Sequence, residues 1–374
     1  MSPSPPASTA ARLQFHARIA GIFLSLYFFI VAIGAMAAAF NMFGREFAEA
    51  VLETTANPLT GLFLGILATS LVQSSSTSTS IIVGMVAGGV ISVEGAIPMI
   101  MGANIGTTIT SMLVSLGHIR RPLELQRGFA AASLHFSFNL LGVMILLPLE
   151  LLTGLVSNLA VLLGGLFQDI GGMRLANPLK AATAPTIEAL AWLTGHRPVL
   201  LLVIALTLTY GMLVSIVKLL RSLMLRKLEH FFDTHLFSTP ARALLFGLLL
   251  TFAVQSSSIP TALAIPLAAA GVIKLMQIYP FSLGANLGTT LTAILAALAT
   301  ANPTAIVVAF AHLLFNIMGI LVVWPLRFIR AIPVAMATRM GQAALRSKML
   351  PVLFVLFVYF IIPAIVVTAV HFAG

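Results

Sequence analysis

The chain has 374 residues, of which 59% are hydrophobic and 8% are charged, and its mean hydropathy is +1.07. Soluble globular domains carry about 25% charged residues, so this composition excludes an ordinary soluble protein and indicates a chain that crosses a membrane several times. The formal net charge of +10 could suggest nucleic acid as a partner, but the basic residues lie between apolar stretches, where they favour anchoring on the cytoplasmic side.

The first segments in chain order are a short tail and one span. Residues 1–18 begin with a stretch rich in Pro, Ser and Ala, which predicts a disordered N-terminal tail. Residues 19–58 then contain a first span, 19–43, and an outer segment. Arg12 and Arg18 precede this span and three glutamates follow it, so we expect the N-terminus to be cytoplasmic.

A polar interruption marks the next segment, residues 59–152. Its apolar stretch 59–93 is broken by eight consecutive amide and hydroxyl residues, Gln73 to Ser80, which cannot face lipid. Two short helices of roughly ten to fifteen residues that meet at this polar centre would form a re-entrant hairpin buried in protein. Residues 96–116 then return inward to Arg120, and 129–152 cross outward again.

The second half of the chain follows the same plan with the opposite sense. Residues 153–197 are an outer connecting segment, and 198–242 hold a span and the most basic cytoplasmic loop. Residues 243–329, with a hairpin over 243–273, therefore start from the cytoplasm, and 330–374 supply an amphipathic basic segment and a last outward span that leaves the C-terminus outside. We predict an all-α polytopic membrane protein with two inverted repeats, each with a re-entrant helical hairpin, and about seven to eight full transmembrane helices.

Two strings repeat at fixed spacing within these segments. Gln-Ser-Ser-Ser begins at Gln73 and at Gln255, and Gly-Ala-Asn-Ile/Leu-Gly-Thr-Thr follows, with Asn104 and Asn286 each 31 residues after the glutamine. The copies therefore align at an offset of 182 without a gap. A His-x-x-Phe-Asn string also recurs, from His135 and from His312, at an offset of 177. Inverted repeats with broken helices are the architecture in which secondary transporters bind substrate near the membrane midplane.

The residues at the two hairpin tips suit an oxyanion. A helix N-terminus presents free N–H groups and a partial positive charge, and hydroxyls add donors without a fixed charge. We expect two facing tips to bind a tetrahedral anion. The candidate substrate ligands are Ser74, Ser75, Ser76, Thr77, Ser256, Ser257 and Ser258.

The same segments carry neutral oxygen atoms that suit a monovalent cation. Ca²⁺ and Mg²⁺ usually recruit carboxylates, which these segments lack, so sodium is the expected coupling ion and no other cofactor is expected. The glycines at 102, 106, 284 and 288 could free backbone carbonyls for the same purpose. The candidate sodium ligands are Gln73, Gln255, Asn104, Thr107, Thr108, Asn286, Thr289, Thr290, Asn139 and Asn316.

Each feature has a plainer interpretation. An isolated Ser or Thr in a membrane helix more often bonds to a carbonyl of its own helix, although seven in succession after Gln73 weigh against that interpretation. Gly106 and Gly288 could serve helix packing as readily as ligand binding. His135 and His312 are more often packed, hydrogen-bonded residues than ligands in such segments.

The chain resembles the type II sodium-phosphate cotransporters, whose signature is a paired Gln-Ser-Ser-Ser with a Gly-Ala-Asn-Ile/Leu-Gly-Thr continuation in two inverted repeats. The resemblance covers about residues 20–370. It implies sodium-driven import of inorganic phosphate. In this family pattern the tips would bind phosphate, nearby neutral side chains would bind sodium, and alternating access would be elevator-like. The partners it implies are phosphate, sodium and the lipid bilayer, without nucleic acid; the oligomeric state stays open, with a dimer as one alternative.

The chain also departs from that family pattern. Animal relatives commonly carry an acidic residue after the histidine of the His-x-x-Phe-Asn string, whereas this chain has Phe136 and Leu313 there. Sodium stoichiometry and electrogenicity therefore stay open. The large outer loop with its cysteines is missing, which is typical of short bacterial members and predicts a bacterial inner membrane with the C-terminus in the periplasm.

Three alternatives remain besides phosphate symport. A sodium-coupled transporter of another small oxyanion would use the same groups. An intramembrane serine hydrolase would use Ser75 or Ser257 as nucleophile, but no Asp or Glu lies beside His135 or His312 to complete a triad. A channel is disfavoured because tips that meet at the midplane suit a closed site, so we expect a transporter and not an enzyme.

Overall fold

The computed structural model describes residues 9–231 and 237–373, and all regular structure in these ranges is helical. Seven of the described helices are long and apolar enough to cross a membrane, or eight if the bent pair Glu46–Glu53 and Pro58–Val72 forms one span. This confirms the predicted all-α fold and the predicted seven to eight spans.

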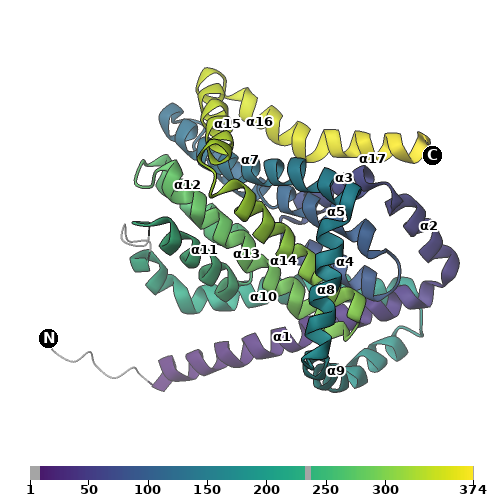
Figure 1. Cartoon of the computed structure of the whole chain (residues 1–374). Helices are drawn as coiled ribbons and strands as arrows, with labels where there is room; N and C mark the ends of the chain where they lie inside the picture. The colour runs from purple at the N-terminus through teal and green to yellow at the C-terminus, as the bar shows by residue number, and fades with distance from the viewer. Residues whose placement is uncertain (1–8, 232–236, 374) are drawn as a thin grey trace.

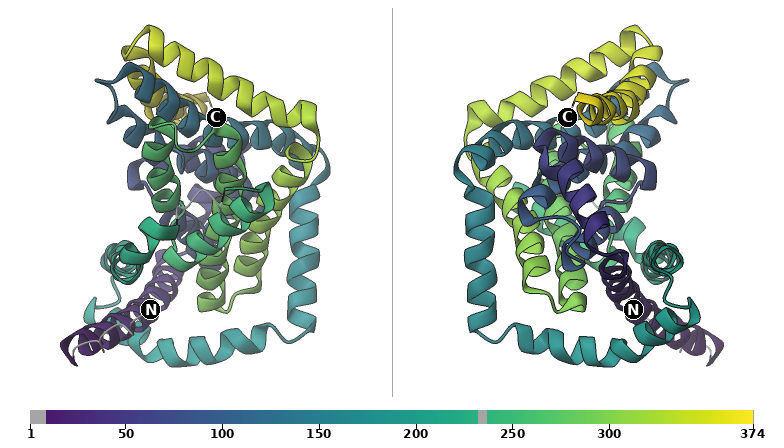
Figure 2. Two further views of the ribbon diagram at one scale, coloured as in Figure 1. Left: turned by 90° about the vertical axis from the view of Figure 1, so that its left-hand side faces the viewer. Right: turned by 90° about the vertical axis from the view of Figure 1, so that its right-hand side faces the viewer.

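The helices form one bundle with elements lying across both of its ends (Figure 1). The long helix α1 (Thr9–Phe43) packs along α10 (Pro198–Phe231). The start of α1 lies at the lower left of Figure 1 and α15 (Arg327–Arg346) at its top, whereas α2 (Arg45–Ala56) lies at the right and α9 (Met173–Leu193) at the bottom. Figure 2 shows α8 (Leu155–Asp169) and α9 running around the periphery of the bundle.

Two segments are more helical than the sequence led us to expect. Helix α1 begins at Thr9, so residues 9–18 are helical although they fall in the segment predicted as a disordered tail. Ala, Leu, Arg and Gln dominate this stretch and are strong helix formers, so the helix extends beyond the apolar span. The rest of that tail, residues 1–8, and positions 232–236 of the basic loop lie outside the described residues. The connecting segment 153–197 consists mainly of α8 and α9.

A buried carboxylate explains the sharp corner after α7 (Pro122–Thr153). Gly154 ends this helix in the left-handed conformation, with φ of 62°. Glu150 is only 8% exposed, and its carboxylate accepts hydrogen bonds from the backbone N–H groups of Val156 (2.6 Å) and Ser157 (3.2 Å). These groups are unpaired donors in the first turn of α8, so Glu150 both caps α8 and opposes its N-terminal partial charge.

Similar helices occur at the two repeated segments. In the first, α3 (Pro58–Val72), α4 (Ser75–Ala87), α5 (Val93–Gly106) and α6 (Ile109–Leu116) precede α7. In the second, α11 (Pro240–Val254), α12 (Ser258–Ala269) and α13 (Leu275–Thr300) precede α14 (Pro303–Val323). Both ends of α3 and α11 differ by the same 182 residues as the sequence strings. The copies differ at one place, because the helix breaks at Thr107 and Thr108 whereas α13 continues through Thr289 and Thr290.

Local signals of the same kind begin and end α3 and α11. Asn57 and Thr239 cap the two N-termini with side-chain oxygens, each followed by a proline at the first helical position. At the other end Gln73 and Gln255 adopt the left-handed conformation with φ of 54° and 55°. A residue in that conformation stops an α-helix, so each apolar run is broken at its Gln-Ser-Ser-Ser string.

Glycines bring the first helix of each set into close contact with the third. A Cβ atom added at Gly102 would lie 1.9 Å from the carbonyl oxygen of Leu62 on α3, and one at Gly284 would lie 1.9 Å from that of Leu244 on α11. The facing glycines Gly65 and Gly247 are equally restricted, at 2.0 and 2.1 Å from a backbone oxygen. Small residues allow membrane helices to approach in this way, so packing alone accounts for these glycines.

We therefore expect Gly102→Ala and Gly284→Ala each to destabilise the protein by about 1–3 kcal/mol or more, because the helices must separate to admit the methyl group. Gly165 on α8 is the matched control, since nothing lies within 4 Å of a Cβ atom built there. Gly165→Ala should be neutral or stabilising. Thermal unfolding in detergent measures both effects, and equal stability of all three variants would contradict this account of the helix crossing.

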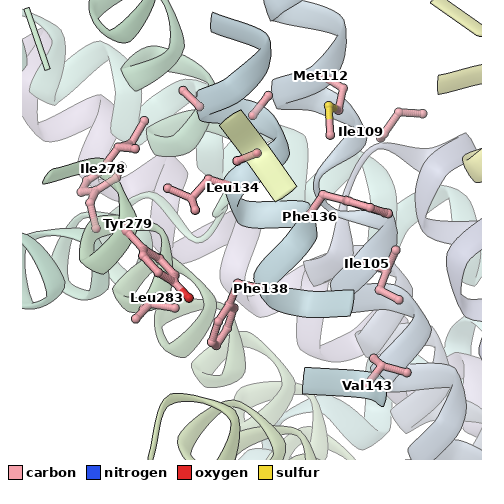
Figure 3. Close-up of a cluster of buried hydrophobic side chains, with 14 of the residues drawn as sticks. Ile105, Ile109, Met112, Leu134, Phe136, Phe138, Val143, Ile278, Tyr279 and Leu283 are labelled. Carbon is pink, nitrogen blue, oxygen red and sulfur yellow. The ribbon is translucent and has the colours of Figure 1, made fainter. Parts of the chain in front are cut away.

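The apolar core lies between α7, α13 and the segment of α5 and α6 (Figure 3). Phe138 of α7 packs edge-on against Tyr279 of α13, with ring centroids 6.0 Å apart. Phe136 points the other way and packs against Phe354 and Tyr359 of the last helical segment, which comprises α16 (Met349–Leu356), a π-helical turn (Phe357–Ile361) and α17 (Ile362–Ala373). The position where animal relatives commonly carry an acid is therefore part of an aromatic cluster in this chain.

Candidate functional site

The two Gln-Ser-Ser-Ser strings lie in contact, although 182 residues separate them in sequence. We call residues 73–76 tip 1 and residues 255–258 tip 2. The Ser76 hydroxyl donates to the carbonyl oxygen of Gln255 at 3.2 Å. A chain of buried hydroxyls also links the tips, from Ser75 to Thr107 at 2.9 Å and from Thr107 to Ser257 at 3.4 Å. Three of the predicted residues thus meet at one point where tip 1, tip 2 and the end of α5 converge.

Backbone donors accompany these hydroxyls. Ser74 caps α4, and its side-chain oxygen accepts from the N–H of Thr77 at 3.2 Å. The first N–H groups of α4 and of α12 have no acceptor within their own helices. The N-cap of α12, Ser257, makes no side-chain capping bond. Both tips therefore combine hydroxyls with backbone N–H groups that have no acceptor in their own helix, apart from that of Thr77, and such donors suit an anion.

A cavity of about 580 Å³ adjoins both tips. Gln73, Ser74 and Thr77 line it from the first tip and its helix, and Gln255, Ser256 and Ser258 line it from the second. Ser75, Ser76 and Ser257 are buried behind this lining. All seven predicted substrate ligands therefore either line the cavity or lie in the contact between the tips beside it.

The rest of the polar run in α4 follows the plainer interpretation. The hydroxyls of Ser78, Thr79 and Ser80 donate to carbonyl oxygens four residues earlier in the same helix, at 3.2, 2.8 and 2.7 Å. These bonds satisfy buried hydroxyls inside an apolar bundle, so the second half of the run needs no ligand to explain it.

A chain of buried amides connects the repeated segments. His135 of α7 bonds through Nε2 to Oδ1 of Asn286 at 2.7 Å, so this ring nitrogen is the donor. Nδ2 of Asn286 donates to Oδ1 of Asn139 at 2.7 Å, and Nδ2 of Asn139 donates to the carbonyl oxygen of Asn104. We call His135, Asn286, Asn139 and Asn104 the amide network. It joins α5, α7 and α13, and His135 has the packed, hydrogen-bonded role expected for it.

The other predicted sodium ligands are more dispersed. Thr108 bonds to the hydroxyl of Tyr359, which ties the break between α5 and α6 to the π-helical turn. Thr289 and Thr290 bond to carbonyls of their own helix, and Asn316 bonds through Nδ2 to the carbonyl of His312. Gln255 accepts from Thr292 at 2.9 Å, whereas Gln73 is exposed. Of the predicted sodium ligands, Gln73 and Gln255 therefore belong to the tips and Thr107 contacts both tips, whereas the remaining side chains are spread over several helices.

Sequence reasoning missed two buried hydroxyls at equivalent positions. Thr69 and Thr251 lie four residues before Gln73 and Gln255, both are 0% exposed, and neither hydroxyl has a hydrogen-bond partner. Threonine in a helix normally satisfies its hydroxyl with a carbonyl one turn earlier. The only sequence signal for these residues was their recurrence at the offset of 182. Because both hydroxyls are buried without a partner, the two positions are candidates for binding a ligand.

Replacing these two threonines by valine tests whether their hydroxyls bind a cation. If the hydroxyls are merely unpaired, Thr69→Val and Thr251→Val should leave transport unchanged and be neutral or stabilising, because an unsatisfied buried polar group is removed. If they are cation ligands, we expect a weaker apparent sodium affinity, by roughly tenfold for a loss near 1.4 kcal/mol. We expect the second outcome. Uptake measured against sodium concentration separates the two, and wild-type sodium dependence in both variants would rule out a ligand role.

These features define a polytopic membrane protein with an internal polar site where two repeated helix breaks meet. The family model described as Na+/Pi-cotransporter matches residues 28–189 and 207–332, and the chain belongs to this family. It is a family of cotransporters and not of enzymes, in agreement with the sequence prediction.

Several relatives share about a third of their residues with the chain. Sodium-dependent phosphate transport protein 2B of Pongo abelii is 32% identical over 435 residues, covering 90% of this chain and 63% of that protein. Protein 2A of Ovis aries is 33% identical over 422 residues, covering 91% and 66%, and human protein 2B is 32% identical over 435 residues, covering 90% and 63%. The chain therefore spans less than two thirds of the length of these relatives. No solved structure matches the chain.

Proposed function

We propose that the protein is a sodium-coupled symporter that imports inorganic phosphate. The observation that carries this proposal is the contact between tip 1 and tip 2 through Ser75, Thr107 and Ser257, beside a cavity that both tips line. Family membership supports sodium and phosphate as the transported ions, since the relatives are named for sodium-dependent phosphate transport. The tips alone would suit another tetrahedral oxyanion equally well.

In this proposal phosphate binds at the two tips, next to the cavity that both of them line. Its oxygens accept hydrogen bonds from the first N–H groups of α4 and α12 and from the serine hydroxyls, and the two helix N-termini oppose its charge. Sodium binds to neutral oxygens near the tips. Candidates are the Thr107 hydroxyl, the unpaired hydroxyls of Thr69 and Thr251, and the unpaired Oδ1 of Asn316. Sodium beside phosphate would reduce the repulsion between phosphate and the surrounding carbonyls, which couples the two ions.

We further infer an elevator-like movement of the tip helices against α1 and α10. The glycine contacts that join α3 to α5 and α11 to α13 leave no room for sliding within each pair, so these helices would move as units. We infer a bacterial inner membrane with the N-terminus and α15 at its cytoplasmic face and the C-terminus at its periplasmic face, and the distribution of basic residues supports this orientation. The two tips then belong to re-entrant hairpins that enter from opposite faces.

A hydrolase is not favoured. Within the described residues neither Ser75 nor Ser257 bonds to a histidine, because Thr107 occupies both hydroxyls and Asn286 occupies His135. The test is uptake of radiolabelled phosphate into proteoliposomes with and without an inward sodium gradient. Accumulation that requires the gradient and is not suppressed by excess sulfate supports the proposal. Downhill flux without sodium, or cleavage of an ester, would overturn it.

A further inference from the structure

A single charged side chain lines the cavity at the tips. Lys218 of α10 is part of the lining, and none of the other lining residues in the described part of the chain is charged. Lys218 is exposed, whereas Thr77 and Ser258 are buried. The cavity therefore extends from an accessible end with an ammonium group to an enclosed end with hydroxyls.

The helices explain how this lysine comes to share a space with the tips. Tyr210, Val214 and Lys218 follow at intervals of four residues, so they lie on one face of α10, and all three line the cavity. Across the cavity, α12 contributes Ile259, Ala262 and Pro266, which continue along that helix from Ser258. Apart from Lys218 and the tips, the walls are mainly apolar. Apolar walls of low dielectric constant concentrate the field of a charge that lies among them.

We propose that this cavity is an anion vestibule in which Lys218 attracts phosphate at the cytoplasmic end of the α10 span, on the side where imported phosphate leaves the tips. The proposal rests on the proposed function, since it concerns the route to the same site. The ammonium group of lysine is compact and strongly hydrated, and its stem is flexible, so it suits transient attraction better than the fixed bidentate binding of arginine. The binding site between the tips contains no charge to attract phosphate from a distance, and the vestibule supplies one.

A plainer role for Lys218 is anchoring of α10 at the lipid surface. Within the described residues Lys218 forms no ion pair, so no carboxylate in this part of the chain neutralises its ammonium group. If Lys218 only anchors the helix, phosphate affinity should not depend on whether the side chain at position 218 is positive or negative. If Lys218 attracts phosphate in the vestibule, a positive charge at this position should raise phosphate affinity and a negative one should lower it. This effect should weaken with salt, because the screening length falls from about 10 Å at 0.1 M to about 3 Å at 1 M.

The chain contains no cysteine, so the charge at this position can be reversed on one purified protein. Lys218→Cys would be treated with 2-aminoethyl methanethiosulfonate, which restores a positive charge, or with 2-sulfonatoethyl methanethiosulfonate, which installs a negative one. Radiolabelled inorganic phosphate binding at saturating sodium is then measured at low and high ionic strength. Arg242→Cys is the control, because Arg242 is an exposed basic residue at the start of α11 that does not line the cavity.

We expect the untreated Lys218→Cys protein to bind phosphate roughly tenfold more weakly than wild type at low salt, with recovery after the positive reagent and further loss after the negative one. The difference should shrink at high salt, and Arg242→Cys should respond to neither reagent. Equal affinity after both reagents would overturn the vestibule while leaving the proposed function intact. Failure of the untreated wild-type chain to bind phosphate would instead overturn the proposed function itself.

Discussion

Ser75→Ala and Ser257→Ala are each expected to abolish or severely weaken phosphate uptake while the protein remains folded in the membrane. Each hydroxyl belongs to the chain through Thr107 that joins the tips. In the proposed complex each also donates to a charged oxygen, and a hydrogen bond to a charged group contributes about 1.5–3 kcal/mol. Loss of one such bond corresponds to roughly a 10- to 100-fold loss of affinity. Both variants should act alike because the two tips contribute to one site.

Ser80→Ala is the matched control for this pair. Ser80 is as buried as the tip serines and lies on the same helix as Ser75, but its hydroxyl donates to the carbonyl of Ser76 within α4 at 2.7 Å. Its removal should cost little, and uptake should stay near the wild-type rate. Initial uptake rates in proteoliposomes, normalised to reconstituted protein, provide the comparison. Wild-type uptake in both tip variants would remove the hydroxyls of the tips from the transport site.

The position of the helix breaks could be predicted from sequence because their causes are local. A run of hydroxyl and amide residues inside an apolar stretch cannot face lipid, and this places a break near Gln73 without any knowledge of tertiary contacts. The repeat at Gln255 adds that the same break occurs twice. That the two breaks lie against each other was a hypothesis based on opposite orientation, and the bond from Ser76 to the Gln255 carbonyl now gives it a specific contact.

Partners across helices could not be predicted in this way. Spacing along a chain shows that Asn139 follows His135 by one turn, but not that both bond to Asn286 on α13. The break at Thr107 could not be predicted either, because Thr107-Thr108 and Thr289-Thr290 end strings that differ only at Ile105 and Leu287, yet only the first pair interrupts its helix. Burial and packing determine these features. The sequence likewise indicates only that Lys218 lies beside a cytoplasmic loop, whereas the structure shows that it lines the cavity at the tips.

Two asparagines at equivalent positions of the repeated strings have different hydrogen-bond partners in the structure. Asn139 and Asn316 occupy matching positions of the His-x-x-Phe-Asn strings, and both were predicted as sodium ligands. The amide of Asn139 is engaged on both sides, since it donates to the Asn104 carbonyl and accepts from Asn286. The amide of Asn316 donates only within its own helix, and its oxygen is buried without a partner.

These two positions should therefore respond differently to alanine. Asn139→Ala leaves the Asn104 carbonyl and the Asn286 amide unpaired in the core, at about 1–3 kcal/mol for each group, so we expect a loss of about 2–6 kcal/mol in stability and a large fall in the yield of folded protein. Asn316→Ala removes only one bond within α14 and should change stability by less than about 1 kcal/mol. The unpaired Oδ1 of Asn316 could bind sodium, so we expect Asn316→Ala also to weaken the apparent sodium affinity by roughly tenfold.

Thermal unfolding in detergent and uptake against sodium concentration separate the two effects. Asn139→Asp serves as a second variant for the network: an ionised carboxylate keeps the acceptor for Asn286 but faces the Asn104 carbonyl as another acceptor and is buried without a partner charge, so we expect it to be at least as destabilised as the alanine variant. A normal sodium dependence in Asn316→Ala would show that its unpaired oxygen is only a packing defect. Equal stability of Asn139→Ala and Asn316→Ala would show that the amide network does not hold α5, α7 and α13 together, and the difference between the repeats would then need another cause.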